Sequence, residues 1–287
     1  MNHPQIAAFA RLAKENTPYL RSIEGQKSLL GRTMHDLAYD AIHDEIVVTS
    51  PLTQAILTFR GDAAGEEAPI RVIQGPKTGI QGVGATGKVA IDPDNNVIML
   101  ATPAPRNEIL FFARDANGDV APLRKIAGPD TLLDNGAQRE GGGNVPAMRV
   151  DPIHNLLLIM TNGRGGGNGS GGRVLVFDRN ASGNVKPKAI IAGPVRAGNQ
   201  FEVYGPNRLL IAHSGKTLDI WKIPESGEST EQPQRIPTPL VRASADTGIA
   251  LDPAHKEVII ATAAGNTIVT FSVPEVFDRP TTTSSSK

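Results

Sequence analysis

The sequence contains no cysteine among its 287 residues and no excess of either charge, because 29 lysines and arginines balance 29 aspartates and glutamates. Without cysteine, disulfides, cysteine-based zinc sites and thiol nucleophiles are excluded. The balanced charge argues against a nucleic-acid-binding protein, which would carry a basic excess or a basic stripe. We therefore predict a protein without a nucleic-acid partner.

Long apolar runs are also missing, since none approaches the roughly 18 residues that a membrane-spanning helix needs. Residues 1–16 lack the basic start and the apolar core of about 7–15 residues that mark a signal peptide. These absences predict no transmembrane segment. They predict a cytoplasmic location for the chain as given, or a periplasmic or extracellular one if the chain is a processed form. The chain also has no Gly-x-Ser-x-Gly motif for nucleophilic catalysis.

What the sequence does contain is an internal repeat. The stretch Ile109–Leu133 recurs with edits at Ile6–Leu30, Ile56–Ile80 and Val174–Gly198, in degraded form at Leu218–Leu240, and truncated at Thr267–Asp278. A repeat of this length implies an array of like structural units. The fold can therefore be predicted from one unit.

Each unit has four expected strands, which we name A to D. Strands A and B are apolar and are joined by Asp-Pro or a similar turn, in which Asp caps the turn and Pro pre-sets φ. They occur at Leu37–Ser50, Val89–Thr102, Met148–Thr161, Glu202–Ser214 and Ile249–Thr262. Strand C ends in an aromatic residue, and strand D carries the pattern Pro-x-Arg-x-Ile-x-Gly. Turns such as Asn117-Gly118 and Ser182-Gly183 supply the positive φ that a C–D hairpin needs.

Four antiparallel strands in about 50 residues are typical of a propeller blade. Strands A and B occur five times, which favours an all-β propeller of five blades; six blades, the last incomplete, is the alternative. The last unit has no strand D, so we expect Tyr19–Gly25 to pair with Thr267–Val273 and close the ring. We predict a single domain over residues 1–278 and a disordered tail over residues 279–287. Residues 1–16 form an N-terminal extension, in which Ile6–Arg11 is a surplus strand or a short helix.

One aromatic residue recurs near the end of each strand C. Because the spacing is one per blade and its neighbours are apolar, we expect each ring to pack between adjacent blades rather than to stack on a ligand. The six residues are Phe9, Phe59, Phe112, Phe177, Trp221 and Phe271.

The combination of the aromatic strand end, the Asn-Gly turn, Pro-x-Arg-x-Ile-x-Gly and x-Ala-x-Asp-Pro resembles the NHL-type β-propeller repeats of bacterial proteins. The resemblance extends over roughly Ile6–Val273. It implies the propeller fold, while members of this broad group include protein-binding scaffolds, sugar-lactone hydrolases and lyases. Fold alone does not choose among these functions.

The two sets of connections differ. The A–B and C–D turns are short and uniform apart from a longer fourth C–D connection, whereas the D–A and B–C loops are long and unlike each other, as in residues 128–146 and 162–172. Variable loops on a rigid scaffold usually carry binding, so we expect the binding surface on the D–A/B–C face around blades 2 to 4. The glycine-rich 162–172 loop runs into a strand and not into a helix, unlike a phosphate-binding loop. Candidate binding residues are Arg106, Arg139, Glu140, Arg149, Asn162, Arg164, Glu202 and His213.

Arg149 and Glu202 break the apolar pattern of strand A in adjacent blades. Because burying either charge alone is costly, we predict that the two interact directly between blades 3 and 4; a ligand or metal site at the mouth of the central channel is the alternative. His213 ends a strand B, on the loop-rich face. By contrast, His43, His154 and His255 occupy equivalent A–B turns, which predicts turn residues.

Two functions remain. The first is a non-catalytic binding or scaffold propeller with a protein partner and no cofactor. The second is a lactonase-like hydrolase that uses Ca²⁺ or another divalent ion as a Lewis acid at the channel mouth. Its candidate ligands are Asp36, Asn144, Glu202 and Asp246. A histidine-based lyase would instead need His213 to face a metal or a second histidine, for which His35 is the candidate. The sequence favours the first function and leaves the oligomeric state open.

Overall fold

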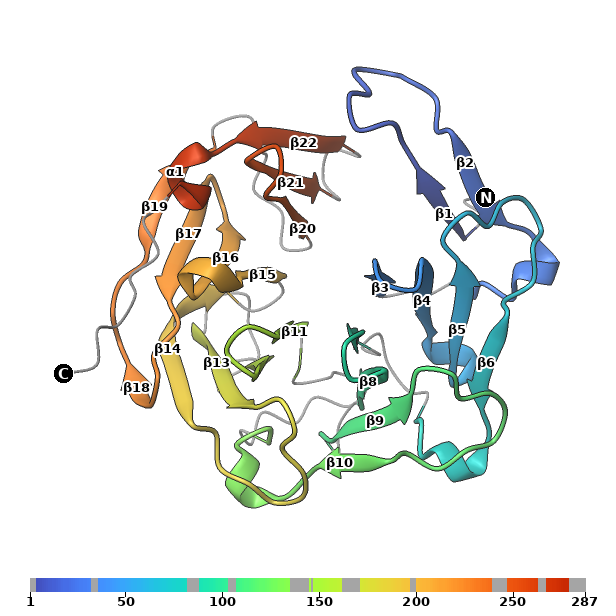
Figure 1. Ribbon diagram of the computed structural model, residues 1–287, viewed down its shortest axis with the longest axis horizontal. Helices are drawn as coiled ribbons and strands as arrows, with labels where there is room; N and C mark the ends of the chain where they lie inside the picture. The colour runs from blue at the N-terminus through green and yellow to red at the C-terminus, as the bar shows by residue number, and fades with distance from the viewer. Residues whose placement is uncertain are drawn as a thin grey trace. The chain divides into compact units, whose positions relative to one another are not determined.

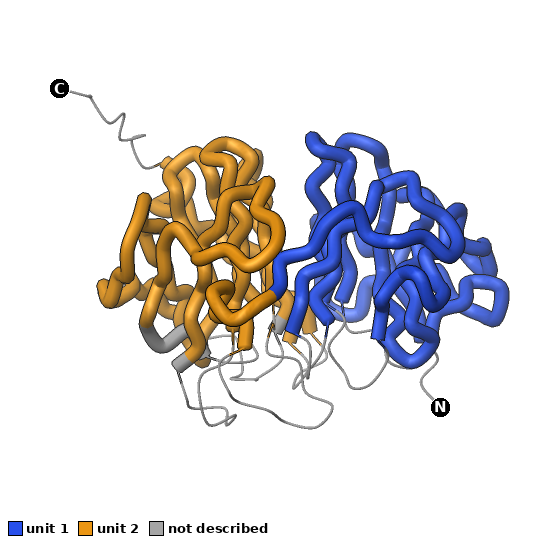
Figure 2. The backbone as a smooth tube through the Cα atoms, turned by 90° about the horizontal axis from the view of Figure 1, so that it is seen from below, with its two compact units in different colours: residues 1–127, 138–143 blue, residues 128–137, 144–287 orange. Residues whose placement is uncertain are grey.

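The computed structural model describes residues 4–31, 36–81, 88–102, 107–134, 145, 147–161, 171–196, 200–238, 247–262 and 267–278. These residues divide into two compact units, coloured separately in Figure 2. Unit 1 comprises Met1–Ala127 and Gln138–Gly143, and unit 2 comprises Gly128–Ala137 and Asn144–Lys287. A single domain over residues 1–278 stays a prediction.

Unit 1 contains three antiparallel sheets, whose strands stand side by side in chain order (Figure 1). A two-stranded sheet pairs β1 (Gln5–Ala8) with β2 (Arg21–Glu24). The next sheet contains β3 (Leu37–Asp40), β4 (Glu45–Ser50), β5 (Ala55–Arg60) and β6 (Arg71–Gln74). The third contains β7 (Lys88–Asp92), β8 (Val97–Ala101), β9 (Ile109–Ala113) and β10 (Arg124–Ile126).

Unit 2 also contains three sheets. The first has β11 (Ala147–Asp151), β12 (Leu156–Thr161), β13 (Gly171–Asp178), β14 (Ala189–Arg196) and, parallel to β14, the short β18 (Gly227–Ser229). The second has β15 (Phe201–Tyr204), β16 (Leu209–Ser214), β17 (Thr217–Lys222) and β19 (Gln234–Pro237). The third has β20 (Thr247–Asp252), β21 (Glu257–Thr262) and β22 (Thr267–Ser272), followed by the single-turn helix α1 (Pro274–Phe277).

The protein is therefore an all-β, five-bladed propeller of small, mainly antiparallel sheets with almost no helix. The five blades are the sheets that begin with β3, β7, β11, β15 and β20, and each starts with the repeated A–B strand pair. Within the part of the chain that the structure describes, no helix has the length and apolar character needed to cross a bilayer.

The N-terminal copy forms a strand pair outside these five blades. Residues Gln5–Ala8 are extended and pair with Arg21–Glu24, so the surplus-strand prediction is confirmed and the helical alternative for Ile6–Arg11 is wrong. The three consecutive apolar residues Ile6, Ala7 and Ala8 gain a ladder of backbone hydrogen bonds that a single helical turn does not offer. Closure of the ring by Tyr19–Gly25 on Thr267–Val273 stays a prediction, because in the described sheets β2 pairs with β1 and β22 with β21. The predicted disordered tail lies outside the described residues.

The strands follow from local chemistry. Apolar and β-branched runs such as Glu45–Ser50 form the buried strands. Each A–B turn ends with a residue at positive φ, a conformation that Asn and Asp adopt more readily than most residues. In blades 1, 2, 3 and 5 these residues are Asp44, Asn96, Asn155 and Lys256.

Apolar clusters form between neighbouring sheets. One joins Val47, Ile56 and Ile73 of the β3–β6 sheet to Leu110 and Phe112 of the next sheet. A second joins the β11–β14 sheet to Trp221 and its neighbours in the following sheet. The recurring aromatic thus packs between blades, as predicted, at Phe112 and Trp221, and Phe59 and Phe177 are buried as well. Phe271 is partly buried against the last cluster, whereas Phe9 is 45% exposed.

Candidate functional site

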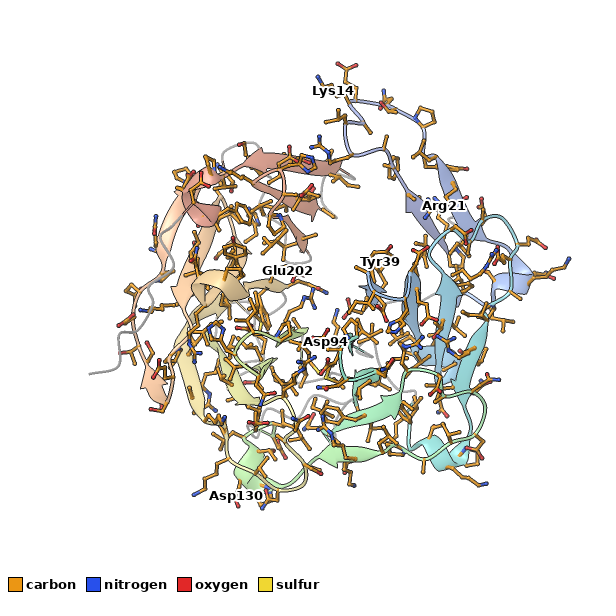
Figure 3. The ribbon with its side chains drawn as sticks, viewed as in Figure 1. Lys14, Arg21, Tyr39, Asp94, Asp130 and Glu202 are labelled. Atoms are coloured by element: carbon orange, nitrogen blue, oxygen red, sulfur yellow. The ribbon has the colours of Figure 1, made fainter. Side chains whose placement is uncertain are left out.

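Arg149 and Glu202 form a direct ion pair, as the sequence predicts. Arg149 lies on β11 and Glu202 on β15, the first strands of adjacent sheets. Glu202 is labelled in Figure 3. The Nε of Arg149 donates to Oε1 of Glu202 at 2.7 Å, and its other nitrogens donate to the carbonyl of Met148 at 2.7 Å and to Oε1 of Gln200 at 3.0 Å. Both side chains are partly buried. The guanidinium is thus oriented by three acceptors, and its structural role is to join blades 3 and 4.

His213 lies near the end of β16, but its side chain is completely buried. Its Nε2 lies 3.1 Å from Oγ1 of Thr238. Burial lowers the pKa of the His213 imidazole, because desolvation disfavours the charged ring, while the nearby Asp219 carboxylate acts in the opposite direction. The neutral imidazole is the form that this site favours. The His213 side chain is enclosed and not open to solvent. A role for it in binding stays a prediction.

The carboxylate of Asp36 is held by the neighbouring sheet. Its Oδ2 accepts a hydrogen bond from the backbone N–H of Val89 on β7 at 3.2 Å. Of the four candidate metal ligands, Asp36 and Glu202 therefore have structural partners, while Asn144 and Asp246 lie outside the described residues. Among the residues that the structure describes, no group of three or more His, Asp or Glu side chains could hold a metal ion.

The candidates Arg106, Arg139, Glu140, Asn162 and Arg164, together with His35, lie outside the described residues. The structure thus locates three of the eight predicted binding residues, and it brings two of them, Arg149 and Glu202, together.

The histidines of the A–B turns are turn residues, as predicted. In three blades the Asp that ends strand A accepts a backbone N–H within the turn and also contacts Nδ1 of the histidine three residues later. These contacts measure 2.8 Å for Asp40–His43, 2.7 Å for Asp151–His154 and 2.7 Å for Asp252–His255. In blade 2 Asn95 takes the histidine position and donates to Asp92 at 2.9 Å. Each Asp therefore fastens its own turn.

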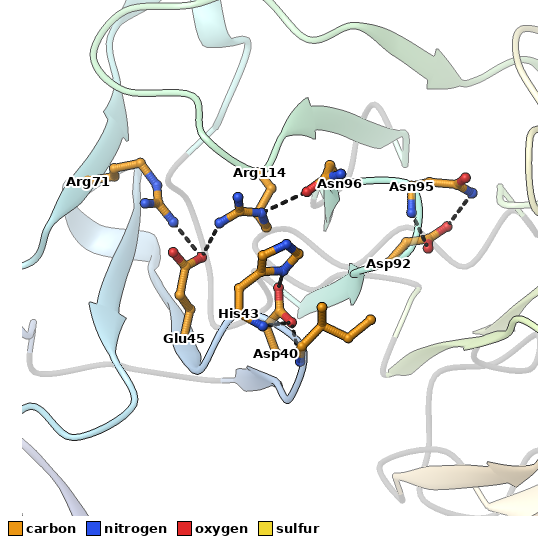
Figure 4. A network of polar contacts seen from close by, with 9 residues as sticks. Asp40, His43, Glu45, Arg71, Asp92, Asn95, Asn96 and Arg114 are labelled. Carbon is orange, nitrogen blue, oxygen red and sulfur yellow. Dashed lines mark hydrogen bonds and ion pairs between the residues drawn. The ribbon is translucent and has the colours of Figure 1, made fainter.

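A charged network between blades 1 and 2 was missed by the sequence analysis (Figure 4). Glu45, which is buried at the start of β4, accepts from Arg71 of its own sheet at 2.5 Å and from Arg114 of the next sheet at 2.9 Å. Arg114 also donates to Asn96 at 2.9 Å. Arg71 is the arginine of the Pro-x-Arg-x-Ile-x-Gly pattern, so that recurring arginine was the available signal.

The C–D strand pairs form antiparallel hairpins, as predicted, and their connections have a second role in addition. Gly118 does have positive φ, at 82°, but it is not the tip of a tight hairpin. Its N–H donates to the carbonyl of Val72 at 2.6 Å and its carbonyl accepts from Gln74 at 3.1 Å, both on the outer strand of the preceding sheet. Gly65 bonds in the same way to Ser22 and Glu24. We call this contact the clasp, and it is reinforced by Asn117 Oδ1, which accepts from the N–H of Val72 at 2.9 Å.

In two blades the residue after the C–D glycine binds the 3-10 turn that follows the outer strand of the preceding sheet. Asp119 Oδ1 accepts from the N–H of Lys77 at 2.7 Å, and Asn184 Oδ1 accepts from the N–H of Asp130 at 2.8 Å. These 3-10 turns are η3 (Pro76–Thr78) and η4 (Pro129–Thr131). In the longer fourth C–D connection, β18 takes over this contact as a strand parallel to β14. The sequence pattern alone predicts only turns at these residues, because Asn117 and its clasp partner Val72 lie 45 residues apart in the chain.

Comparison with known proteins identifies the fold without a family. No protein-family model matches the chain, and no curated protein matches it. Solved structures do match. One is the β-propeller domain of Cps50 (Swd1) from Myceliophteria thermophila, with a TM-score of 0.51 and 9% sequence identity over 84% of this chain. This chain spans 65% of that protein's chain, so it is shorter than this relative.

Two further structures give the same result. A chain of the Mitotic Checkpoint Complex matches with a TM-score of 0.53 and 15% identity, over 89% of this chain and 67% of that one. A functionally unknown protein from Desulfotomaculum acetoxidans matches with a TM-score of 0.53 and 13% identity, over 94% of this chain and 90% of that one. At these identities the similarity shows the propeller fold alone.

Proposed function

We propose that this chain is a non-catalytic propeller with NHL-type repeats that binds a protein partner through its D–A/B–C face. The observation that carries this proposal is the similarity in fold to a chain of the Mitotic Checkpoint Complex, which is a protein assembly. Propellers that share only the fold differ widely in function, so further support has to come from the contacts within this chain.

The described contacts support a scaffold. The polar residues of the A–B turns are engaged in fastening those turns. The charges inside the blades are paired across blade interfaces, as in Arg149–Glu202 and Arg71–Glu45–Arg114. Such pairs rigidify neighbouring sheets. The long loops 128–146 and 162–172 differ in sequence from the loops of the other blades, as binding loops on a rigid scaffold do. These loops contain Arg139, Glu140 and Arg164, which are suited to polar contacts with a protein surface.

A pull-down from cell extract tests this proposal. The bait is the full chain, compared with a variant in which residues 162–170 are replaced by a two-residue turn. We expect the variant to keep the wild-type melting temperature and to lose a partner that the wild type retains. The matched control is Ile153→Ser, which changes an exposed residue of an A–B turn and should leave partner recovery intact. Equal recovery by all three proteins would place binding on another surface.

The alternative is a divalent-metal-dependent, lactonase-like hydrolase with Asp36, Asn144, Glu202 and Asp246 as ligands. A bound ion stabilises the folded state by an amount that grows with the logarithm of its free concentration, about 2.7 kcal/mol at a hundredfold excess over Kd. Thermal melting in Ca²⁺ or Zn²⁺ against chelator measures this directly. A stabilisation that disappears in Glu202→Gln would favour the hydrolase, whereas equal melting temperatures favour the scaffold.

A further inference from the structure

The hairpin of β1 and β2 exposes an apolar surface near its tip. Phe9 is 45% exposed, Leu12 69% and Tyr19 46%. The rings of Phe9 and Tyr19 meet edge to face with their centroids 6.4 Å apart. Lys14 marks this tip in Figure 3. We call Phe9, Leu12, Asn16 and Tyr19 the hairpin patch.

The same positions are covered in the later copies of the repeat. Phe59, Phe112 and Phe177 replace Phe9, and all three are at most 1% exposed. Phe59 packs in one cluster with Ile23, and Phe112 in another with Ile73, so the cover in both cases is the outer strand of the preceding sheet. The first copy thus has the surface that is buried between blades in the later copies, but here its aromatic residue is exposed.

Two substitutions make the first copy more apolar than the others. Leu12 stands where the later copies have Asp62, Asp115 and Asn180, and Tyr19 stands where they have Pro69, Pro122 and Pro187. An exposed apolar surface carries a solvation cost, so contiguous apolar residues of this kind mark interaction sites. An aromatic pair beside leucine is suited to an apolar partner segment.

The tip also has the backbone of a clasp. Glu15 has φ 54°, where the clasp glycines Gly65 and Gly118 have 63° and 82°. The N–H of Ala13 donates to the carbonyl of Ala10 at 2.9 Å, as Ala63 does to Arg60 and Ala116 to Ala113. Asn16 occupies the position of Asp119 and Asn184, whose side chains bind the 3-10 turn of the preceding sheet. The conformation that holds an outer strand is therefore already formed in the first copy.

We propose that the hairpin patch binds an extended segment of a partner protein that resembles the outer strands of this propeller. The segment has an isoleucine two residues before a glycine, and a 3-10 turn follows. Its apolar residue packs on Phe9 and Leu12, its backbone pairs with residues 14–16, and its turn N–H donates to Asn16 as Lys77 donates to Asp119. This surface is separate from the D–A/B–C face, so either proposal can fail without the other.

Fluorescence anisotropy tests this with a labelled peptide of residues 69–81, PIRVIQGPKTGIQ, added to the full chain. We expect saturable binding that weakens at least about tenfold for the double variant Phe9→Ser/Asn16→Ala and for a peptide carrying Ile73→Ser. The matched control on the protein is Leu52→Ser, an exposed apolar residue of another segment, which should bind as the wild type does.

Three results would overturn the proposal. One is no saturable binding, or binding unchanged in the double variant. Another is a lower melting temperature of Phe9→Ser without peptide, which would mean that the chain itself covers the patch. The third is concentration-dependent dimerisation that Phe9→Ser abolishes, measured by light scattering, which would make a second copy the occupant.

Discussion

At the scale of single residues, one copy of the repeat differs from the others by a buried histidine, His213. Counted from the positive-φ residue of each A–B turn, His213 occupies the position of Thr49, Ala101 and Met160 in blades 1 to 3, all of which are buried. None of these three side chains becomes charged, whereas an imidazole can. Burial lowers the pKa of the His213 imidazole, which favours the neutral ring, and Thr238 is its hydrogen-bond partner.

His213 should therefore make stability depend on pH. Burial lowers the pKa of His213 in the folded state, so the unfolded chain binds more protons once the pH falls below the usual histidine pKa of about 6.5. Its contribution to stability is complete above that pH, and it is lost progressively as the pH falls toward the folded-state pKa. Urea unfolding at pH 7.5 and pH 5.0 should show a smaller pH-dependent loss in His213→Gln than in the wild type.

The control for this prediction is His255→Asn, which removes an A–B turn histidine with substantial exposure. This variant keeps the buried His213 and should retain the acid sensitivity that His213 causes. If His213→Gln loses as much stability between the two pH values as the wild type, the acid sensitivity has another origin.

At the scale of elements, the clasp explains why a glycine follows the outer strands β6 and β10. Gly75 has φ 135°, a conformation that side-chain-bearing residues rarely adopt. A Cβ at Gly75 would lie 2.5 Å from the Asp119 carboxylate, and one at Gly128 would lie 2.5 Å from Asn184. The glycine thus lets the next sheet approach closely, and the Asp or Asn side chain fastens the contact.

Changing either partner of the clasp should destabilise the protein. Asp119→Ala removes a hydrogen bond from the N–H of Lys77 and should cost about 1 kcal/mol. Gly75→Ala adds backbone strain and a clash, and should cost about 2 kcal/mol or more. Asp119→Ala removes the carboxylate but leaves its own Cβ 2.6 Å from the new Cβ, so it relieves part of the clash and the double variant should be more stable than the sum of the two changes predicts. Strict additivity in urea unfolding would contradict the clasp.

At the scale of the whole molecule, stability depends on contacts between consecutive sheets. Phe112 and Trp221 are buried against the preceding sheet, and the ion pair Arg149–Glu202 joins two neighbouring sheets. The N-terminal hairpin differs, because its aromatic residue is 45% exposed. Removal of a buried interface ring such as Phe112 should therefore lower the free energy of unfolding far more than removal of the Phe9 ring.

Phe112→Ala and Phe9→Ala make this comparison at equivalent positions of the repeat. Phe112 is fully buried between two sheets, so its truncation should reduce the free energy of unfolding by about 3–5 kcal/mol. Phe9→Ala should change it by less than about 0.5 kcal/mol, as surface substitutions usually do. Similar losses in thermal or urea unfolding would show that both rings support the fold equally.

The sequence by itself determined the repeat unit, the five-bladed all-β fold, the turn role of His43, His154 and His255, and the pairing of Arg149 with Glu202. The repeat unit, the fold and the turn histidines follow from local periodicity. The Arg149–Glu202 pair follows from the cost of burying a single charge, because the two residues lie in neighbouring repeats. Only the tertiary structure revealed the clasp, the Glu45 network and the enclosure of His213. Each of these depends on which residues of the next sheet come within hydrogen-bond distance, and local sequence patterns do not encode such distances.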